Sequence, residues 1–283
     1  MRNIRYIIAA LIAAFSLATY YCNTQKNPIT GESQHVAMSV EQEIGLGLEA
    51  APQMMEQYGG LHPNQEAQAL VDKVGQKVVQ ENVPNSPYKF DFHLLADEQT
   101  VNAFALPGGQ IFITAALMNR LQNEEQLAGV LGHEVGHVVN RHSAEHMAKA
   151  KLTQGLTGAG VIAAYDPNNP GSISRVAMVA AVGQLINMKY GRDDELESDR
   201  FGVQYMINSG YNPNQMVEVM KILEQAGGGS ARRPEFMSTH PDPGNRIAQI
   251  QKAIQEFGAG DGTYPTGEPN ARNPQSNDRQ QDW

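Results

Sequence analysis

The sequence predicts a mostly helical α+β domain, and three observations support this fold class. Apolar residues recur at helical spacing over long segments, a few short segments alternate as strands do, and 283 residues are enough for one sizeable core. The strand-like segments lie together in the first half of the chain, while helical patterns dominate the second half. We therefore expect one folded domain at residues 39–258, flanked by segments of other kinds.

The chain begins with a targeting segment at residues 1–21. Arg2 and Arg5 give it a basic start, and an almost unbroken apolar run follows from Tyr6 to Ala18. This run is short for a membrane span and is typical of the apolar region of a signal peptide. We expect residues 1–21 to direct export and to be removed afterwards.

The single cysteine, Cys22, comes directly after the targeting segment. One cysteine excludes an internal disulfide and a cysteine-rich zinc site. Its position resembles a bacterial lipobox, which implies a lipidated thiol that becomes the first residue of the mature chain; Asn23 after it favours the outer membrane of a Gram-negative cell. Tyr21 stands where a lipobox has a small residue, so the alternative is a signal peptide or uncleaved anchor that happens to end near a cysteine.

The elements of the expected domain follow a polar, turn-rich stretch at residues 22–38, which predicts a tether. Two amphipathic helices come first, at residues 39–58 and 65–80, because their apolar residues share one helix face. Three short strands are predicted next, on alternation and turn residues, at 88–94, 102–106 and 110–114.

The second half of the chain holds the remaining helices and a tail. Residues 152–190 are rich in glycine, alanine, valine and methionine around a polar turn, which predicts a helical hairpin whose role the sequence leaves open. Neither half of this hairpin is long enough to span a bilayer. Residues 259–283 are almost free of aliphatic side chains and are predicted to be disordered.

The charge distribution excludes one class of partner. The net charge is −9, and it becomes −11 for the chain after residue 21, because the first segment contains two arginines and no acid. A surface that binds nucleic acid needs clustered lysine and arginine. We therefore expect no nucleic-acid partner.

The motif that carries chemistry is His133-Glu134-Val135-Gly136-His137, an HExxH pattern. Residues four apart share a helix face, so both imidazoles can bind one zinc ion, and Glu134 lies beside them to take a proton from water. Asn123 and Gln126 form a capping signal that begins the helix. Gly132 and Gly136 leave room for a neighbouring element to approach closely.

A third zinc ligand is expected on a second helix that begins near Asp193. Glu195 and Asp199 are four apart and share a face, so Glu195 can bind the metal while Asp199 accepts the N–H of a ligand histidine. Glu197 points away from Asp199 and, with Asp194, is the alternative ligand. His142 and His146 do not share the face of His137, so they are expected on a solvated surface rather than in a second metal site.

These motifs together resemble the gluzincin metallopeptidases of the HtpX, Oma and CaaX prenyl-protease type, and more narrowly the BepA/LoiP-like periplasmic lipoproteins. The resemblance rests on the zinc motif, on Glu195 with Asp199, and on three further segments: 27–31, 102–109 and 240–246. It covers nearly all of residues 22–258. A C-terminal helical-repeat domain and multiple membrane spans, which some of these relatives have, are not seen in the sequence.

The resemblance also implies roles for residues that spacing alone does not single out. Asn102, Ala103 and Phe104 would form an exposed edge strand to which an extended substrate adds as a further strand. His240 and Arg246 would lie near the metal, as regulatory or transition-state residues; a surface histidine is the alternative for His240. The implied fold is a gluzincin peptidase domain with a small sheet beside the HExxH helix.

The function that we expect is that of a zinc-dependent metalloendopeptidase with one zinc ion per chain. Its substrates would be misfolded or unassembled cell-envelope proteins, at the periplasmic side of the outer membrane, with a soluble periplasmic or exported location as the alternative. The competing function is a lipid-anchored chaperone or assembly factor for outer-membrane proteins, in which proteolysis is latent or minor.

Overall fold

A computed structural model describes residues 2–164, 190–228, 234–241 and 244–258. The contacts of the chain divide it into two compact units, residues 1–39 with 141–189 and residues 40–140 with 190–283. The sequence predicts one domain, and the structure divides the chain where a helix ends at Val139 and the next begins at His142. Arg141 between them has a left-handed backbone (φ 57°), which ends the first helix. The expected tail at 259–283 lies outside the described residues.

The second unit contains the sheet and most of the described helices. Its strands are β3 (Asp91–Leu95), β4 (Ala103–Ala105) and β5 (Gln110–Thr114), in the order β3-β5-β4. β5 runs parallel to β3 and antiparallel to β4, so β4 lies at an edge of this sheet. The strand predicted at 88–94 is shorter at its start than expected, since Tyr88 to Phe90 lie outside β3. The other two predicted strands are present.

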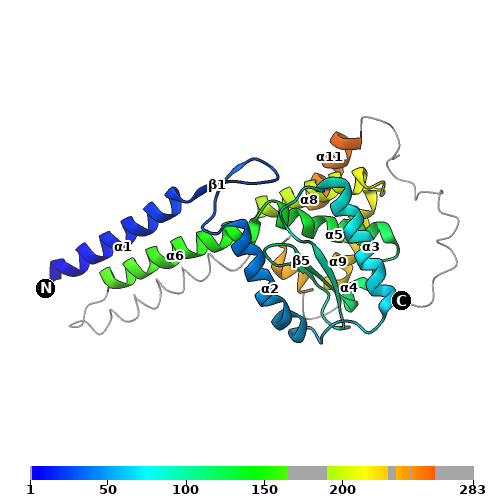
Figure 1. Cartoon of the computed structure of the whole chain (residues 1–283), viewed down its shortest axis with the longest axis horizontal. Coiled ribbons are helices and arrows are strands. Elements are labelled where there is room, and N and C mark those ends of the chain that lie inside the picture. Colours follow the sequence, from blue (N-terminus) through cyan, green and yellow to red (C-terminus); the bar gives the residue numbers. More distant parts are fainter. Residues whose placement is uncertain (1, 165–189, 229–233, 242–243, 259–283) are drawn as a thin grey trace. The chain divides into compact units, whose positions relative to one another are not determined.

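The described helices of this unit are α2 (Val40–Gln57), α3 (Gln65–Asn82), α4 (Ala115–Met118), α5 (Glu124–Val139), α8 (Arg192–Asn208), α9 (Asn214–Gly228), α10 (Phe236–Thr239) and α11 (Arg246–Gly258). They include the four that the sequence predicts individually there, which are α2, α3, α5 and α8. α5 is the central one, because it contacts α3, α8, α9 and the sheet (Figure 1). Every residue of α5 from Gln126 onward is buried.

The close contact of α5 with α8 depends on glycine, as the sequence predicts. A β-carbon on Gly136 would lie 3.2 Å from the Cα atom of Ser198, and one on Gly132 would lie 3.5 Å from the Cα atom of Gly202. The two backbones can therefore approach without side chains between them. This contact fixes the position of α8 relative to the HExxH motif.

The first unit contains α1 (Arg2–Cys22), a two-stranded hairpin and α6 (His142–Ala164). The hairpin, β1 (Thr24–Lys26) with β2 (Ser33–His35), occupies the segment that the sequence predicts as a tether. Its turn is built by Asn27, whose Oδ1 accepts the N–H groups of Ile29 and Thr30 at 2.8 and 3.1 Å. The polar composition of both strands hid this hairpin from the sequence patterns.

Two further features of the first unit bear on the predictions. The stretch Ile4–Cys22 of α1 is the one described helix that is long and apolar enough to cross a membrane. His142 is 1% exposed, so the expectation that it lies on a solvated surface is wrong. It begins α6 directly after the left-handed Arg141, whose guanidinium is buried and donates to the Met38 carbonyl at 2.9 Å. The turn therefore carries His142 inward.

Candidate metal centre

His133 and His137 lie on one face of α5 and direct their Nε2 atoms to the same point. The two Nε2 atoms are 3.0 Å apart, and each residue is 2% exposed. The helix that holds them begins at Asn123, whose side chain accepts the N–H of Gln126 at 2.9 Å. Gln126 in turn accepts the N–H of Gln122 at 2.7 Å. The predicted capping box is therefore present, except that the Gln126 side chain bonds to the residue before the N-cap instead of to the N-cap itself.

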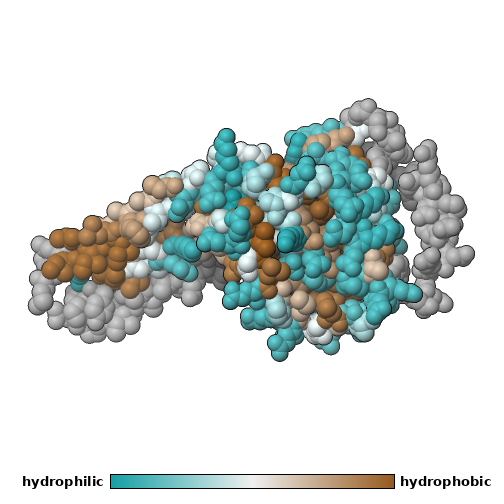
Figure 2. Space-filling view, viewed as in Figure 1, coloured by the Kyte–Doolittle hydropathy of each residue, from teal (hydrophilic) through white to brown (hydrophobic). Residues whose placement is uncertain are grey.

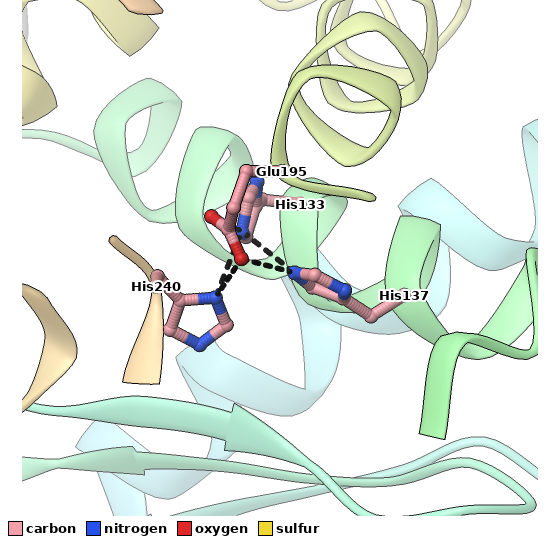
Figure 3. A group of neighbouring side chains, drawn as sticks. All are labelled: His133, His137, Glu195 and His240. Atoms are coloured by element: carbon pink, nitrogen blue, oxygen red, sulfur yellow. Dashed lines mark hydrogen bonds and ion pairs between the residues drawn. The ribbon is translucent and has the colours of Figure 1, made fainter. Parts of the chain in front are cut away.

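α8 brings Glu195 to the two histidines (Figure 3). Its Oε1 lies 3.4 Å from Nε2 of His137, and its Oε2 lies 3.5 Å from Nε2 of His133. Glu195 is fully buried, which would raise its pKa, but the neighbouring histidines His240, His137 and His133 outweigh burial and hold the pKa far below its usual value. The carboxylate is therefore an anion, as a metal ligand must be.

The three side chains fit a zinc ion. Ligand atoms bound to one tetrahedral zinc at roughly 2.1 Å lie about 3.4 Å from one another. Here the two Nε2 atoms are 3.0 Å apart, and the two oxygens of Glu195 lie 3.4 Å from His137 and 3.5 Å from His133. Burial also lowers the pKa of His137 well below its usual value, so this imidazole is neutral and offers a lone pair. The donor set of two histidines and one glutamate is that of a catalytic zinc site, which leaves a fourth position open.

Asp199 supports the site from one helical turn beyond Glu195. Its Oδ1 is 2.9 Å from Nδ1 of His133, the nitrogen that does not face the cluster. Arg246 at the start of α11 binds both oxygens of Asp199, at 2.7 and 2.8 Å. Burial would raise the pKa of Asp199, but the guanidinium and the histidine outweigh it and the pKa is lowered. The carboxylate can therefore fix the tautomer and orientation of His133.

Glu134 is completely buried, and neither of its carboxylate oxygens has a hydrogen-bond partner among the described residues. Burial raises its pKa, against the lowering effect of His240 and His133. Its one ion pair within the described part of the chain is with Nε2 of His240, at 3.6 Å. A buried carboxylate without a hydrogen bond is costly, and functional sites are where such groups are found. The side chain is available to hold or release a proton beside the histidine pair.

His240 is the fourth member of this cluster. Its Nδ1 is 3.0 Å from Oε1 of Glu195 and 3.3 Å from Nε2 of His133, and all four residues offer atoms within 4.8 Å of one another. Burial would lower its pKa, but the carboxylates of Glu134 and Glu195 outweigh it and raise the pKa. The ring of Phe236 stacks on it at 4.4 Å, so α10 holds the histidine in place.

Spacing within the sequence did not single out two residues, one that contacts this cluster and one that contacts the edge-strand region. The ring of Tyr190 stacks on that of His137 at a centroid distance of 4.4 Å. Tyr58 donates to Glu235 at 2.6 Å and accepts from Asn102 at 3.3 Å, which joins α2, the start of β4 and the residue before α10. Both contacts join segments far apart in the chain, and no pattern in the sequence signals them.

The edge strand β4 lies against α5 and presents part of its backbone outward. The Leu106 N–H donates to Gln110 and the Thr114 N–H donates to Asn102, which makes 102, 104 and 106 the positions hydrogen-bonded to β5. The N–H and C=O groups of Ala103 and Ala105 therefore point away from β5, and of these two residues Ala103 is fully buried while Ala105 is partly exposed. Of the three residues that the sequence predicts as an exposed edge, Asn102 and Phe104 direct their backbone to β5, and Asn102 and Ala103 are buried, at 1% and 0% exposure.

Val101 is the next residue before Ala103 whose backbone points away from β5, and its carbonyl already accepts a hydrogen bond. The carbonyl of Val101 accepts the N–H of Phe236 at 3.1 Å. The segment that carries His240 is thus hydrogen-bonded to the edge at which an added strand would begin. Cys22 belongs to the other unit, where it is exposed at the end of α1.

A buried HExxH pair completed by a glutamate from a second helix, within a mostly helical α+β fold, defines a zinc metallopeptidase. The model of peptidase family M48 matches residues 63–254, which include both helices of the metal site. The chain belongs to peptidase family M48.

Individual relatives agree with this family. The chain is 30% identical over 271 residues to the beta-barrel assembly-enhancing protease of Escherichia coli K12, covering 89% of this chain and 52% of that protein. It is 28% identical over 257 residues to the mitochondrial metalloendopeptidase OMA1 of Schizosaccharomyces pombe, covering 90% of this chain and 73% of that protein. The chain thus spans about half the length of the bacterial relative.

Proposed function

We propose that this zinc metallopeptidase is an endopeptidase that hydrolyses misfolded or unassembled proteins of the cell envelope. The observation that carries the proposal is the buried carboxylate of Glu134, which has no hydrogen-bond partner among the described residues, beside the His133, His137 and Glu195 cluster. A zinc ion bound there would polarise the scissile carbonyl and lower the pKa of an attacking water. The residues of the chain supply the proton transfers and the orientation.

Glu134 is proposed as general base and then general acid. It accepts the proton of the attacking water and delivers it to the leaving amine, and a raised pKa suits a group that must hold that proton between the two steps. Asp199 is proposed as a positioning residue, since it faces the outer nitrogen of His133 at 2.9 Å. Arg246 neutralises Asp199 and holds α11 against the site.

The substrate is proposed to bind as an added strand at the open edge of β4. Ala105 is partly exposed and offers its N–H and C=O groups there, whereas the buried Ala103 must be uncovered before it can pair. Such pairing recognises backbone rather than side chains. This mode suits unfolded segments of varied sequence, because a folded protein has few free extended strands to offer. It supports misfolded or unassembled chains as the substrate class.

His240 is proposed to regulate the site. Its Nδ1 stands among the ligand atoms, and its segment is hydrogen-bonded to Val101 at the start of the edge. A substrate strand that extends to this position must displace Phe236, and this displacement would move His240 away from the cluster. The alternative role is to stabilise the transition state through Nε2, which has no hydrogen-bond partner among the described residues.

The two roles of His240 predict opposite results. If it closes the site, His240→Ala raises the rate of peptide cleavage above that of the unchanged protein. If it stabilises the transition state, the same variant lowers kcat and leaves zinc content unchanged. Zinc content measured on each sample separates either result from loss of the metal.

The location and attachment are proposed from the sequence and from one relative. The apolar Ile4–Cys22 helix supports a signal or anchor, and Cys22 is proposed as a lipidation site at the periplasmic side of the outer membrane. One similar protein is named for enhancing beta-barrel assembly, which supports the envelope as the site of action. Metabolic labelling with a palmitate analogue should mark the unchanged protein and spare Cys22→Ser; labelling of both would contradict lipidation.

A second candidate function is that of a chaperone or assembly factor with little proteolysis. The name of the same relative favours it, and so does the position of His240 within the ligand cluster. Glu134→Gln discriminates the two. If this variant still rescues the envelope defect of a deletion strain, cleavage is not the main function.

The direct test is cleavage of casein and of an unfolded porin. The unchanged protein should cleave both, and Glu134→Gln and chelator treatment should each abolish cleavage. Glu134→Gln should keep its zinc, because Glu134 is not one of the three proposed ligands. Cleavage that survives chelation, or that Glu134→Gln retains, would contradict the proposal.

A further inference from the structure

The first unit presents an apolar surface that the peptidase site does not use. Within α1, the stretch Ile4–Cys22 is long and apolar enough to cross a membrane, and almost all of its residues are at least partly exposed. Ile7, Leu11 and Phe15 are 58%, 64% and 71% exposed. Figure 2 shows a hydrophobic surface on the N-terminal part of this helix, which becomes paler toward its other end. A helix that is apolar and exposed on most sides is suited to lipid.

α6 lies along α1 and runs in the opposite direction (Figure 1). Gly155 of α6 packs against Ser16 of α1 so closely that a β-carbon on Gly155 would lie 2.0 Å from the serine Oγ. Ala148 and Ala159 of α6 are also buried, at 6% and 5% exposure. Helices that pair within a bilayer commonly meet through such small residues.

The charge-free parts of the two helices coincide. α6 has no charged residue from Leu152 to Ala164, and its last charges are Lys149 and Lys151. A groove between the helices is lined by Lys151 and Leu152 on α6 and by Thr19 and Tyr20, among others, on α1. The uncharged stretch of α6 therefore begins beside the end of the apolar run of α1. From there the two helices lie side by side, α6 toward Ala164 and α1 toward its N-terminus.

The residues at this level have the composition of a membrane interface. Tyr20 and Tyr21 end the apolar run of α1, and Lys149 and Lys151 lie on the first half of α6. Tyrosine and lysine are enriched where a helix leaves the hydrocarbon for the headgroups. From there, the 13 residues Leu152–Ala164 extend about 20 Å at 1.5 Å per residue, which is less than the roughly 30 Å of a hydrocarbon core.

We propose that Leu152–Ala164 is a second membrane-embedded segment, which enters the lipid bilayer beside α1 and places Lys149 and Lys151 at the phospholipid headgroups. The lipid bilayer is the partner that fits the apolar run of α1, the uncharged stretch of α6 beside it and the basic residues at their common end. Leu156, 38% exposed on α6, faces the acyl chains. In the chain that retains α1, the segment would hold the first unit at the membrane together with this helix.

The test uses the full chain with Cys22→Ser and one new cysteine, Leu156→Cys, labelled with an environment-sensitive fluorophore. The matched control is Leu48→Cys, which replaces another exposed leucine, on α2 of the other unit. Both proteins are reconstituted in vesicles of equal parts phosphatidylethanolamine and phosphatidylglycerol. We expect a blue shift at position 156 and several-fold stronger quenching by nitroxides on the lipid chains than at position 48.

Two results would overturn the proposal. Quenching of the position-156 probe by aqueous iodide to the same degree as the position-48 probe would place α6 in water. A blue shift that appears without vesicles and grows with protein concentration would show that a second copy of the chain covers this surface. Zinc content and peptide cleavage, measured on the same samples, report on the other unit and remain as in Cys22→Ser.

The headgroup part of the proposal has its own variant. Lys149→Glu combined with Lys151→Glu should reduce quenching at position 156 in the anionic vesicles and leave it unchanged in phosphatidylcholine vesicles. Unchanged quenching in both would overturn the placement of these lysines. Equal loss in both would do the same, since it would show that the lysines act on α6 itself and not on the lipid.

Discussion

Asp199 is the residue whose role is most sharply defined by its neighbours. It contacts His133 on one side and Arg246 on the other, and it is 1% exposed. The helical angle between Glu195 and Asp199 was sufficient to predict that both face the histidine pair. The arginine came only from the resemblance, because its position on α11 depends on a contact between helices far apart in the sequence.

Replacing Asp199 by asparagine should weaken zinc binding. Asparagine keeps the shape but loses the negative charge that fixes the His133 tautomer, so we expect about a 10- to 100-fold loss of zinc affinity. Competition with a chromophoric chelator measures this affinity. Glu197→Gln on the same helix is the control and should bind zinc as the unchanged protein does. Equal affinity for all three proteins would remove the positioning role from Asp199.

Replacing Tyr58 by phenylalanine should change how stability depends on alkaline pH. Burial, the hydrogen bond to Glu235 and the charges of Glu235 and Asp97 raise the pKa of Tyr58 from 10.0 to about 12. The folded protein thus holds this proton more tightly than the unfolded chain. The resulting stability is fully present below pH 10 and is lost as the pH rises toward 12.

Tyr58→Phe should therefore be less stable than the unchanged protein near neutral pH, since it loses two hydrogen bonds, and should lose less further stability above pH 10. Urea unfolding at a series of alkaline pH values measures both effects. Tyr205 and Tyr211 also have raised pKa values but are present in both proteins, so the difference isolates Tyr58. Parallel stability curves would refute the raised pKa.

At the scale of elements, the contact between α5 and α8 assembles the metal site. Glu195 reaches the two histidines only because glycine at 132, 136 and 202 lets the helices approach. A β-carbon on Gly202 would lie 3.3 Å from the backbone nitrogen of His133. The separation of these helices therefore sets the distance between the glutamate and the histidines.

Gly136→Ala should destabilise the protein and weaken zinc binding together. The added carbon would meet backbone atoms of Ser198 at 3.2 Å, which cannot move without shifting α8. Overpacking of this kind costs about 1–3 kcal/mol, against a gain of about 1 kcal/mol in helix propensity. Gly45→Ala on α2, where the added carbon would meet no atom within 4 Å, should instead be neutral or slightly stabilising. Thermal unfolding compares them, and equal shifts would contradict the argument.

Ala105→Pro should weaken substrate binding without disrupting the sheet. Its N–H faces the open edge rather than β5, and proline is tolerated at such edge positions. The loss of one backbone hydrogen bond to a substrate strand, about 0.5–1.5 kcal/mol, corresponds to a roughly 2- to 13-fold lower kcat/KM on unfolded casein. Ala105→Ser keeps the N–H and should cleave normally. A proline variant that cleaves as well as the serine variant would place the substrate elsewhere.

The sequence predicted the elements with strong patterns and missed those without them. α5, α8 and the three strands carry helical or alternating apolar residues and capping signals, so their positions followed directly. β1 and β2 consist of polar residues held by the Asn27 turn, and no periodicity marks them. The inward turn of His142 likewise depends on the backbone of Arg141, which spacing cannot reveal.

At the scale of the whole molecule, the proposed metal site and the apolar N-terminal helix belong to different units. The three proposed metal ligands, His133, His137 and Glu195, belong to the second unit, while the apolar helix and Cys22 belong to the first. Between His137 and Glu195 the chain leaves the second unit for the first and then returns. The histidines and the glutamate therefore come from two segments of the second unit, 40–140 and 190–283, that are far apart in sequence. A metal bound to them joins α5 to α8 and resists separation of those segments.

Zinc removal should therefore lower the stability of the second unit. A ligand at 1,000 times its Kd stabilises the folded state by about 4 kcal/mol, and each kcal/mol shifts Tm by roughly 2–4 °C for a body of this size. We expect a chelator to lower Tm by about 8–16 °C and added zinc to restore it. Glu134→Gln should respond in the same way, because it keeps all three ligands. His137→Ala should start at a lower Tm and not respond to the chelator. A Tm of the unchanged protein that is the same with zinc and with chelator would show that the metal does not hold these helices together.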